Sequence, residues 1–295
     1  MKSLFYDIKS QPWNADDFFI PKNVKDIYTM LTDEEGLLLR WVAECYFSGA
    51  GAICELGTFL GGSSARLAYG LSKNANKTNK KIQCFDRYEC AEHHKQQLLY
   101  QHGIKPFDGV DILPISKQVL AAFADYIEFN KCDILDAYWD KGPIEVLFID
   151  IAKTRQTNDH VMATFFPHLI PGQSLVIQQD YFHHTNPWVV AQLEALIDCF
   201  ELVAYTKDNS AVFRCLRLPS KEELARATTA NMDYQQLVDY LITAMNRFPS
   251  YRHKQHLARA MLTLKSLPTA NTAWQFENQT ISFQDLDEVI CSSLQ

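Results

Sequence analysis

The residues from Ala52 to Ser63 have the sequence AICELGTFLGGS, and this stretch decides the fold. Its first five residues, Ala52–Leu56, are mostly apolar and predict a short buried strand. The turn that follows is rich in glycine and leads directly into a predicted helix over 64–71. In such a turn Gly57 permits the sharp bend, and Gly61 and Gly62 let a ligand approach the backbone at the helix N-terminus.

Strands and helices alternate along the residues that follow. Further strands are predicted over 81–86, 126–130, 144–150 and 174–177, and helices over 89–102, 157–168 and 186–199. This alternation predicts an α/β protein with a mostly parallel sheet and helices on both faces. Two closely spaced strands, 200–205 and 211–216, predict an antiparallel hairpin after the last helix of the sheet.

Helical segments flank this α/β region on both sides. Thr32 with Glu35, and Ser220 with Glu223, each form a capping-box pattern that marks a helix start. The pattern predicts three parts: an N-terminal helical lead-in over 1–50, an α/β domain over 51–218, and a helical C-terminal appendage over 219–295.

Composition and charge narrow the class of protein. The chain has 295 residues, with 28 Lys and Arg against 35 Asp and Glu, for a net charge of −7. This balance argues against a nucleic-acid partner held by a basic field. No apolar run is long enough for a membrane span, and the N-terminus lacks the apolar segment of a signal peptide. None of the eight cysteines forms Cys-x-x-Cys, so we expect a reducing, cytoplasmic location and no zinc site.

The spacing of the glycines bears on the identity of the ligand. A dinucleotide-binding loop has glycine at i, i+2 and i+5, but the residue at i+2 from Gly57 is Phe59. No Gly-Lys-Ser/Thr follows, so a Walker loop is absent as well. Asp86 ends the second predicted strand, where a carboxylate suits the two hydroxyls of a ribose. A dehydrogenase would use the same acid, so Asp86 does not separate the two classes.

The remaining pattern, Glu-x-Gly-x-x-x-Gly-x-Ser, resembles that of class I S-adenosylmethionine-dependent methyltransferases. It is most similar to the O-methyltransferase branch with the catechol and macrocin types, and the resemblance covers about 25–217, including the closing hairpin. It implies a Rossmann-like sheet whose last strand is antiparallel. It also implies that Glu55 and Gly57 lie beside the methionine part of the cofactor, with Gly61 and Ser63 on its other side.

Two acids after later strands extend this resemblance. It implies that Asp86 binds the ribose of the cofactor. The segment from Asn130 to Leu135 resembles the family's Gly-Asp-Ile segment, which contacts adenine, with Cys132 in place of glycine. Asp133 is carried over on this match, although a solvent-exposed aspartate fits the same pattern.

The acceptor side of the site is less clearly marked. Asp150 and Asp180 follow two predicted strands, where metal-dependent members of the family hold Mg²⁺ through acids. Such a metal would lower the pKa of a substrate hydroxyl. Asp150-Ile151-Ala152-Lys153 also resembles the Asp-x-x-Lys of the catechol-type branch, in which the lysine is the general base. A lysine in that role must be partly neutral, which needs burial or a nearby cation.

The chain departs from the family pattern at one of the expected acids. Where the macrocin type ends its fifth strand in Asp-Asp-Tyr, this chain has Gln179-Asp180-Tyr181. Glutamine is a poorer ligand for Mg²⁺, so the use of a metal stays open. His183, in the loop that follows, is the candidate base for a metal-free reaction.

The sequence therefore predicts an S-adenosylmethionine-dependent methyltransferase that methylates an oxygen of a small molecule. Asp150, Lys153, Asp180 and His183 are its candidate catalytic residues, and Asp150 and Asp180 its candidate metal ligands. We expect no nucleic-acid or membrane partner, and a homodimer stays open. Two alternatives remain at this point: a Rossmann-type NAD(P)-dependent oxidoreductase, and a non-catalytic binding module on a methyltransferase fold.

Overall fold

A computed structural model describes residues 7–76, 79–276 and 282–293. The chain divides into two compact units, Met1–Ala137 and Tyr138–Gln295. The boundary falls inside the α/β domain predicted over 51–218, and the predicted three-part division stays a prediction. Residues 1–6 of the lead-in and 277–281 of the appendage lie outside the described residues.

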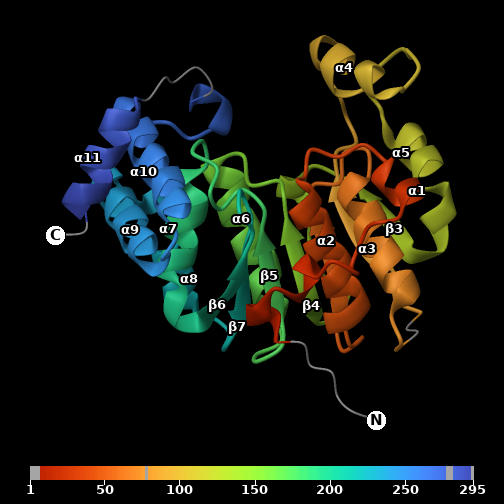
Figure 1. Ribbon diagram of the computed structural model, residues 1–295, viewed down its shortest axis with the longest axis horizontal. Coiled ribbons are helices and arrows are strands. Elements are labelled where there is room, and N and C mark those ends of the chain that lie inside the picture. The colour runs from red at the N-terminus through yellow and green to blue at the C-terminus, as the bar shows by residue number, and fades with distance from the viewer. Residues whose placement is uncertain (1–6, 77–78, 277–281, 294–295) are drawn as a thin grey trace. The chain divides into compact units, whose positions relative to one another are not determined.

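The predicted strands are all present, with ends shifted by a residue or two (Figure 1). The strands are β1 (Ala52–Leu56), β2 (Ile82–Asp86), β3 (Ile127–Lys131), β4 (Ile144–Ile149), β5 (Leu175–Gln178), β6 (Phe200–Tyr205) and β7 (Ala211–Cys215). The α-helices are α1 (Lys22–Lys25), α2 (Asp33–Trp41), α3 (Gly62–Lys73), α4 (Glu92–Leu98), α5 (Leu113–Val119), α6 (Arg155–Phe165), α7 (Pro187–Ala195), α8 (Lys221–Arg226), α9 (Tyr234–Arg247), α10 (Tyr251–Ser266) and α11 (Phe283–Ser293).

The first unit contains three parallel strands. β1 pairs with β2 and β2 pairs with β3, so the carboxyl ends of these strands lie at one edge. The capping box of Thr32 and Glu35 starts α2 as predicted. Helices α2 and α3 pack against each other, as Figure 1 shows.

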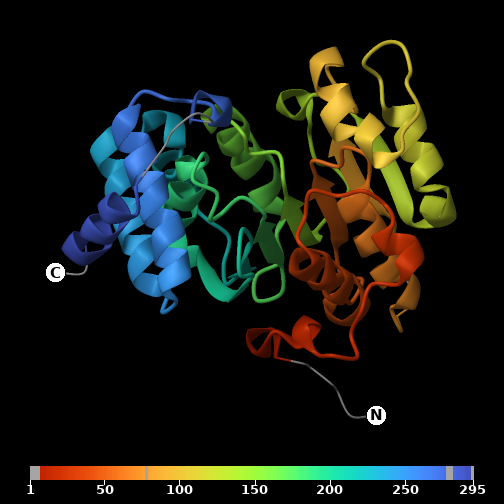
Figure 2. The ribbon, with the colours of Figure 1, turned by 45° about the horizontal axis from the view of Figure 1, so that its top comes forward.

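A long connection joins β2 to β3 and carries α4 and α5 (yellow to yellow-green in Figure 2). The helix predicted over 89–102 is shorter, because Glu89 forms an antiparallel bridge with Asp111 instead of starting it. Tyr88, Leu99 and Ile112 of the connection form a buried apolar cluster with Leu60 of the glycine turn. The connection therefore packs onto the turn and helps to fix it.

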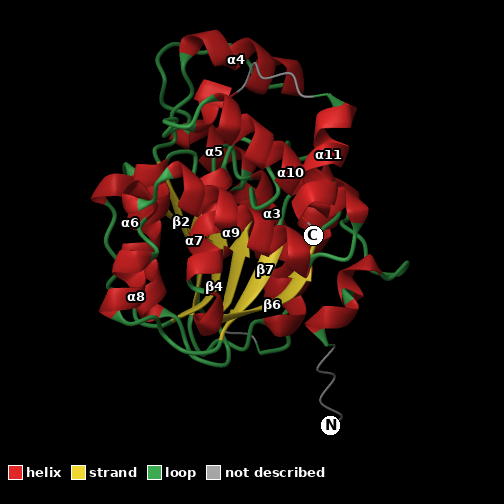
Figure 3. Ribbon diagram, turned by 90° about the vertical axis from the view of Figure 1, so that its left-hand side faces the viewer, coloured by secondary structure: helices red, strands yellow, loops and turns green. Residues whose placement is uncertain are grey.

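The second unit contains the antiparallel part of the sheet. β4 pairs with β5 in parallel, while β7 is antiparallel to both β5 and β6. Figure 3 shows β6 and β7 side by side. The strand order is β3-β2-β1 within the first unit and β4-β5-β7-β6 within the second. The predicted fold class is confirmed: a mostly parallel α/β sheet that closes with an antiparallel hairpin.

The C-terminal helices pack within the second unit. The predicted capping box of Ser220 and Glu223 starts α8. Helix α9 packs on α7 and on α10, and α10 packs on α11. The predicted helix over 157–168 begins earlier, at Arg155, because Thr154 caps it, and α6 ends at Phe165 before a short 3₁₀ turn. Among the described residues, no helix is both long and apolar enough to cross a bilayer.

Candidate functional site

Glu55 lies fully buried in β1, the strand that leads into the glycine turn. Its Oε2 accepts hydrogen bonds from the Ser64 hydroxyl and from the Cys84 thiol, the latter at 3.0 Å. Burial raises the pKa of the Glu55 carboxyl, although hydrogen bonds from Ser63 and Ser64 oppose the shift. Glu55 therefore ties β1 to the first turn of α3 and to β2, and Ser63 is buried beside it.

The glycines of the turn adopt backbone conformations that other residues rarely take. Gly57 has φ of 98°, and its N–H donates to the Phe85 carbonyl at 2.9 Å. Gly61 has φ of 96°, and a Cβ there would lie 2.3 Å from Cδ1 of Leu120. A Cβ on Gly62 would lie 2.4 Å from the carbonyl oxygen of Tyr28. The sequence predicted that a ligand approaches the backbone here, but the chain's own atoms fill the space beside Gly61 and Gly62.

Asp86 at the end of β2 binds the backbone of the turn. Its Oδ2 accepts from the N–H groups of Thr58 and Phe59, both at 2.9 Å, and its Oδ1 accepts from the N–H of Tyr88 at 2.5 Å. Phe59 and Tyr88 have φ near +50°, a conformation that costs a non-glycine residue roughly 1 kcal/mol or more. Asp86 thus stabilises two unfavourable backbone conformations.

This arrangement limits what Asp86 can offer a cofactor. A carboxylate has about four acceptor positions, and three already bind backbone N–H groups. With the turn as it stands, Asp86 has one acceptor position left. It can therefore bind one ribose hydroxyl and not the predicted two.

A backbone hydrogen bond joins the residue before Asp133 to Asp86. The Cys132 N–H donates to the Asp86 carbonyl at 3.0 Å. Asp133 Oδ1 accepts from the Leu135 N–H at 3.0 Å and caps the short helix η6 (Ile134–Asp136), while 41% of its side chain is exposed. The side chain is therefore accessible for the predicted contact with adenine, a role that stays a prediction.

In the second unit the structure brings together Asp150, Lys153 and Asp180. Lys153 Nζ donates to Asp150 Oδ1 at 2.9 Å and also to Asp180 Oδ2. Gln179, oriented with its amide nitrogen toward the acids, donates to Asp150 Oδ1 at 3.0 Å and to Asp180 Oδ1 at 2.6 Å. These four residues follow the neighbouring parallel strands β4 and β5. We call them the strand-end cluster.

The charge state of Lys153 follows from this cluster. Enclosure of its ammonium group lowers the pKa, but the charges of Asp150 and Asp180 outweigh that effect and raise the pKa well above its usual value. Lys153 is therefore protonated at neutral pH. The general-base role that the resemblance assigns to Lys153 does not fit this state, because a base must first be neutral.

The strand-end cluster is also a poor match for Mg²⁺. The ammonium of Lys153 already bridges the two carboxylates that were predicted as metal ligands. Where the family pattern has a further acid, this chain has Gln179. The amide N–H groups of Gln179 point at both carboxylates. No group of three or more His, Cys, Asp or Glu side chains suited to a metal occurs in the part of the chain that the structure describes. We therefore derive no chemical step through a metal.

His183 and His184 follow the strand-end cluster in sequence. Their rings stack, with centroids 4.9 Å apart and planes 28° apart. Burial lowers the pKa of His183, with Asp180 opposing the shift. Burial, with the nearby charge of Arg259, lowers the pKa of His184 to about 4. Both imidazoles are therefore neutral at pH 7 and able to accept a proton.

The sequence analysis missed an ion pair near this loop, in which Glu194 is buried and Arg247 is partly exposed. Glu194 of α7 accepts from Arg247 Nε of α9 at 2.9 and 3.0 Å and from the Tyr181 hydroxyl at 3.3 Å. The Arg247–Glu194 pair anchors the C-terminal appendage on α7 and fixes Tyr181 in the core. The two partners lie 53 positions apart, so no local pattern could have revealed the contact.

Comparisons with known proteins agree with this class of fold. Residues 54–181 match the family model Methyltransf_24, described as a methyltransferase domain. No curated protein matches the chain. Similar solved structures include the O-methyltransferase NovP, at 15% identity over 64% of this chain and 82% of that one, with a TM-score of 0.47.

Two further structures are similar at the same level. One is cofactor-bound Rv0187 from MTB, at 14% identity over 71% of this chain and 87% of that one, with a TM-score of 0.44. The other is an O-methyltransferase from Bacillus cereus in complex with SAH, at 16% identity over 70% and 94%, with a TM-score of 0.45.

Residues 54–181 match a methyltransferase domain, and this match bears out the predicted methyltransferase class. The match favours a methyltransferase over the Rossmann-type oxidoreductase that the sequence left open. The matched segment includes every predicted site residue except His183.

Proposed function

We propose that this chain transfers the methyl group of S-adenosylmethionine to an oxygen of a small-molecule acceptor. In this proposal Glu55, Gly57, Gly61, Ser63, Asp86 and Asp133 form or support the cofactor side. The strand-end cluster and His183 act on the acceptor.

The observation that carries the proposal is the protonated lysine of the strand-end cluster. Lys153 holds a positive charge beside Asp150 and Asp180, and 42% of its side chain remains exposed. An ammonium group stabilises an oxygen that becomes anionic as it loses its proton. It would repel an amine acceptor carrying its own positive charge, which favours oxygen as the methylated atom.

The chemistry needs a proton acceptor as well as a charge. His183 Nδ1 lies 2.7 Å from the Thr185 hydroxyl oxygen. If Nδ1–H donates to Thr185, Nε2 is free to take the proton of the acceptor hydroxyl. The acceptor oxygen then forms a bond to the methyl carbon, and the carbon–sulfur bond of the sulfonium breaks to leave a neutral sulfide. The cofactor supplies the reactive methyl group, and the protein supplies alignment, charge and the base.

A product assay tests the choice of oxygen. The protein would be incubated with S-adenosylmethionine and with phenols and benzylamines of similar size, and the methylated products would be identified by mass spectrometry. We expect methyl ethers from the phenols. Transfer to the benzylamines alone would contradict the proposal.

The same assay tests metal assistance. Because Lys153 already bridges both acids, we expect treatment with EDTA to leave the rate of ether formation within about twofold. A rate that collapses with EDTA and returns with Mg²⁺ would show that the cluster opens to bind a metal.

A further inference from the structure

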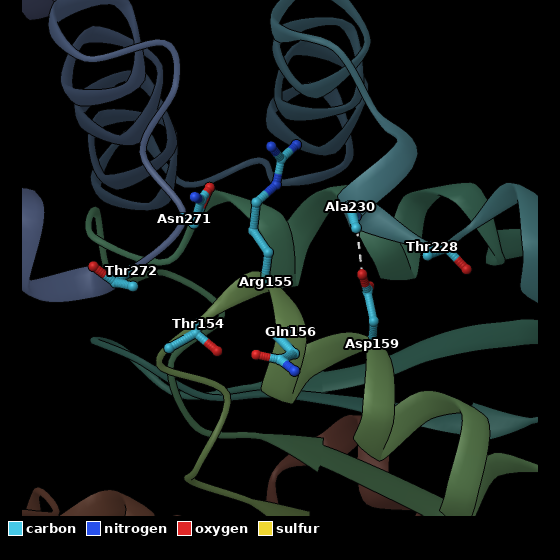
Figure 4. A pocket seen from close by; sticks show the side chains of 8 residues that line it. All are labelled: Thr154, Arg155, Gln156, Asp159, Thr228, Ala230, Asn271 and Thr272. Atoms are coloured by element: carbon cyan, nitrogen blue, oxygen red, sulfur yellow. Dashed lines mark hydrogen bonds between the residues drawn. The ribbon is translucent and has the colours of Figure 1, made fainter. Parts of the chain in front are cut away.

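The second unit contains a cavity of about 670 Å³. Its walls come from the start of α6, from the short helix η9 (Thr229–Asn231) with the residue before it, and from the C-terminal segment around Asn271 (Figure 4). Thr154, Gln156, Thr228, Asn271 and Thr272 contribute hydroxyl and amide groups. A lining of this kind suits a polar small molecule.

Arg155 supplies positive charge to this cavity. Figure 4 shows its side chain beside Asn271, with Asp159 and Ala230 on its other side. Its Nη2 donates to the Met232 carbonyl at 2.8 Å, and its Nε has no acceptor among the described residues. A guanidinium has five N–H donors, so most of this one's capacity is unused. Burial lowers the pKa of Arg155, a cost to its charge that an anionic partner would offset.

The one acid of the wall is already bound by the protein. Asp159 Oδ1 accepts from the Thr229 N–H and hydroxyl at 2.7 and 2.8 Å and from the Gln192 amide at 3.0 Å. Its Oδ2 accepts from the Ala230 N–H at 2.9 Å. These donors offset the negative charge, and Oδ2 still has room to accept from a hydroxyl of a ligand.

The helix dipole adds to the positive side. Thr154, Arg155 and Gln156 are the N-cap and first two residues of α6, which has 11 residues, and all three line the cavity. The N-terminus of a helix carries partial positive charge and favours an anion. The Arg155 guanidinium and the helix N-terminus thus both favour a negatively charged ligand in this cavity.

We propose that this cavity binds a small hydroxylated anion, a carboxylic acid or phosphate ester that carries hydroxyl groups. The anionic group binds the Arg155 guanidinium, with the partial positive charge of the α6 N-terminus adding to the attraction, and a hydroxyl donates to Asp159. Asp150, Lys153 and Asp180 do not line the cavity, so the proposal does not rest on the proposed methyl transfer.

The cavity lies next to the backbone of Lys153, a residue of the strand-end cluster. The Ala273 N–H donates to the Lys153 carbonyl at 2.8 Å, and the Arg155 N–H donates to the Asn271 carbonyl at 2.9 Å. The C-terminal segment is thereby bound to the backbone on both sides of Thr154. A ligand that contacts Arg155 and Asn271 stabilises the segment from which the Lys153 side chain extends.

Calorimetric titration of the full chain tests the site with three probes: D-gluconate, D-glucose 6-phosphate and neutral D-glucose. We expect one or both anions to bind at least about tenfold more tightly than glucose. Preference between the two anions identifies the anionic group as a carboxylate or a phosphate. Equal affinity for all three, or no binding by either anion, would overturn the proposal.

Two charge variants locate the binding. Gln156→Glu and Asn271→Asp each add a negative charge at an exposed position that lines the cavity, one on α6 and one in the C-terminal segment. Both should weaken anion binding by about tenfold or more. Glutamate in the first turn of a helix is favourable, so Gln156→Glu should fold normally. The matched control, Gln97→Glu on exposed α4 of the other unit, should bind as wild type. Anion affinity that survives both variants would place the ligand elsewhere.

Discussion

Carboxylates lie at the ends of parallel strands in both units, but the groups that they bind differ. In the first unit Asp86 ends β2 and binds three backbone N–H groups of its own chain. In the second unit Asp150 and Asp180 bind the side-chain ammonium of Lys153. Asp86 stabilises a backbone conformation, whereas Asp150 and Asp180 stabilise the positive charge of Lys153.

This difference indicates how each acid contributes to function. A carboxylate that stabilises a turn acts on a ligand through the shape of the turn. In the proposed function, a carboxylate that fixes a protonated lysine acts through the electrostatic field at the acceptor. Substitutions at the two places should therefore change different properties: stability and cofactor binding at Asp86, and the rate of transfer at Lys153.

The largest expected effect is on the rate of transfer in Lys153→Met. Loss of the positive charge should lower kcat for oxygen methylation by roughly 10²–10³-fold, with little change in the Kd for S-adenosylmethionine. The measurement is single-turnover transfer of a labelled methyl group, with Lys105→Met, an exposed lysine, as the control. Equal loss of rate and of cofactor affinity would show that the two regions do not act separately.

Next in size is the loss of stability in Asp86→Ala. The N–H groups of Thr58, Phe59 and Tyr88 lose a charged acceptor, which should cost roughly 2–4 kcal/mol of unfolding free energy. Urea unfolding measures the change, and Asp108→Ala at an exposed position is the control. A loss similar to the control's would mean that Asp86 does not hold the turn.

A smaller effect concerns pH and His184. Its pKa falls from 6.5 to about 4 on folding, so the unfolded chain binds more protons between these values. Stability should therefore be fully present above pH 6.5 and fall as the pH drops toward 4. His184→Gln should make that fall less steep in urea unfolding measured across this range. An unchanged pH slope would show that His184 is not buried as described.

The smallest effect is expected for Asp133→Ala. This half-exposed side chain makes one capping hydrogen bond, so the loss should be about 0.5–1 kcal/mol. If Asp133 also contacts adenine, the Kd for S-adenosylmethionine should rise by several-fold while that of Asp108→Ala does not. A Kd equal to wild type would remove Asp133 from the cofactor site.

The sequence predicted the strands, the closing hairpin and the capping boxes because each depends on local patterns. The periodicity of apolar residues and the pairing of Thr32 with Glu35 lie within a few positions. The strand-end cluster was partly predictable, since Asp150 and Lys153 are close in sequence. What could not be predicted depends on tertiary distances. These features are the contact of Leu120 with Gly61, the effect of Asp180 on the pKa of Lys153, and the cavity lined by Arg155.

The most direct test of the central claim is calorimetric titration of the full chain with S-adenosylmethionine, with NAD as the control ligand. The account predicts binding in the micromolar range for wild type, the same affinity for Lys153→Met, a weaker affinity for Asp86→Ala, and no binding of NAD. Absence of binding by folded wild-type protein, or a competing signal from NAD, would contradict it.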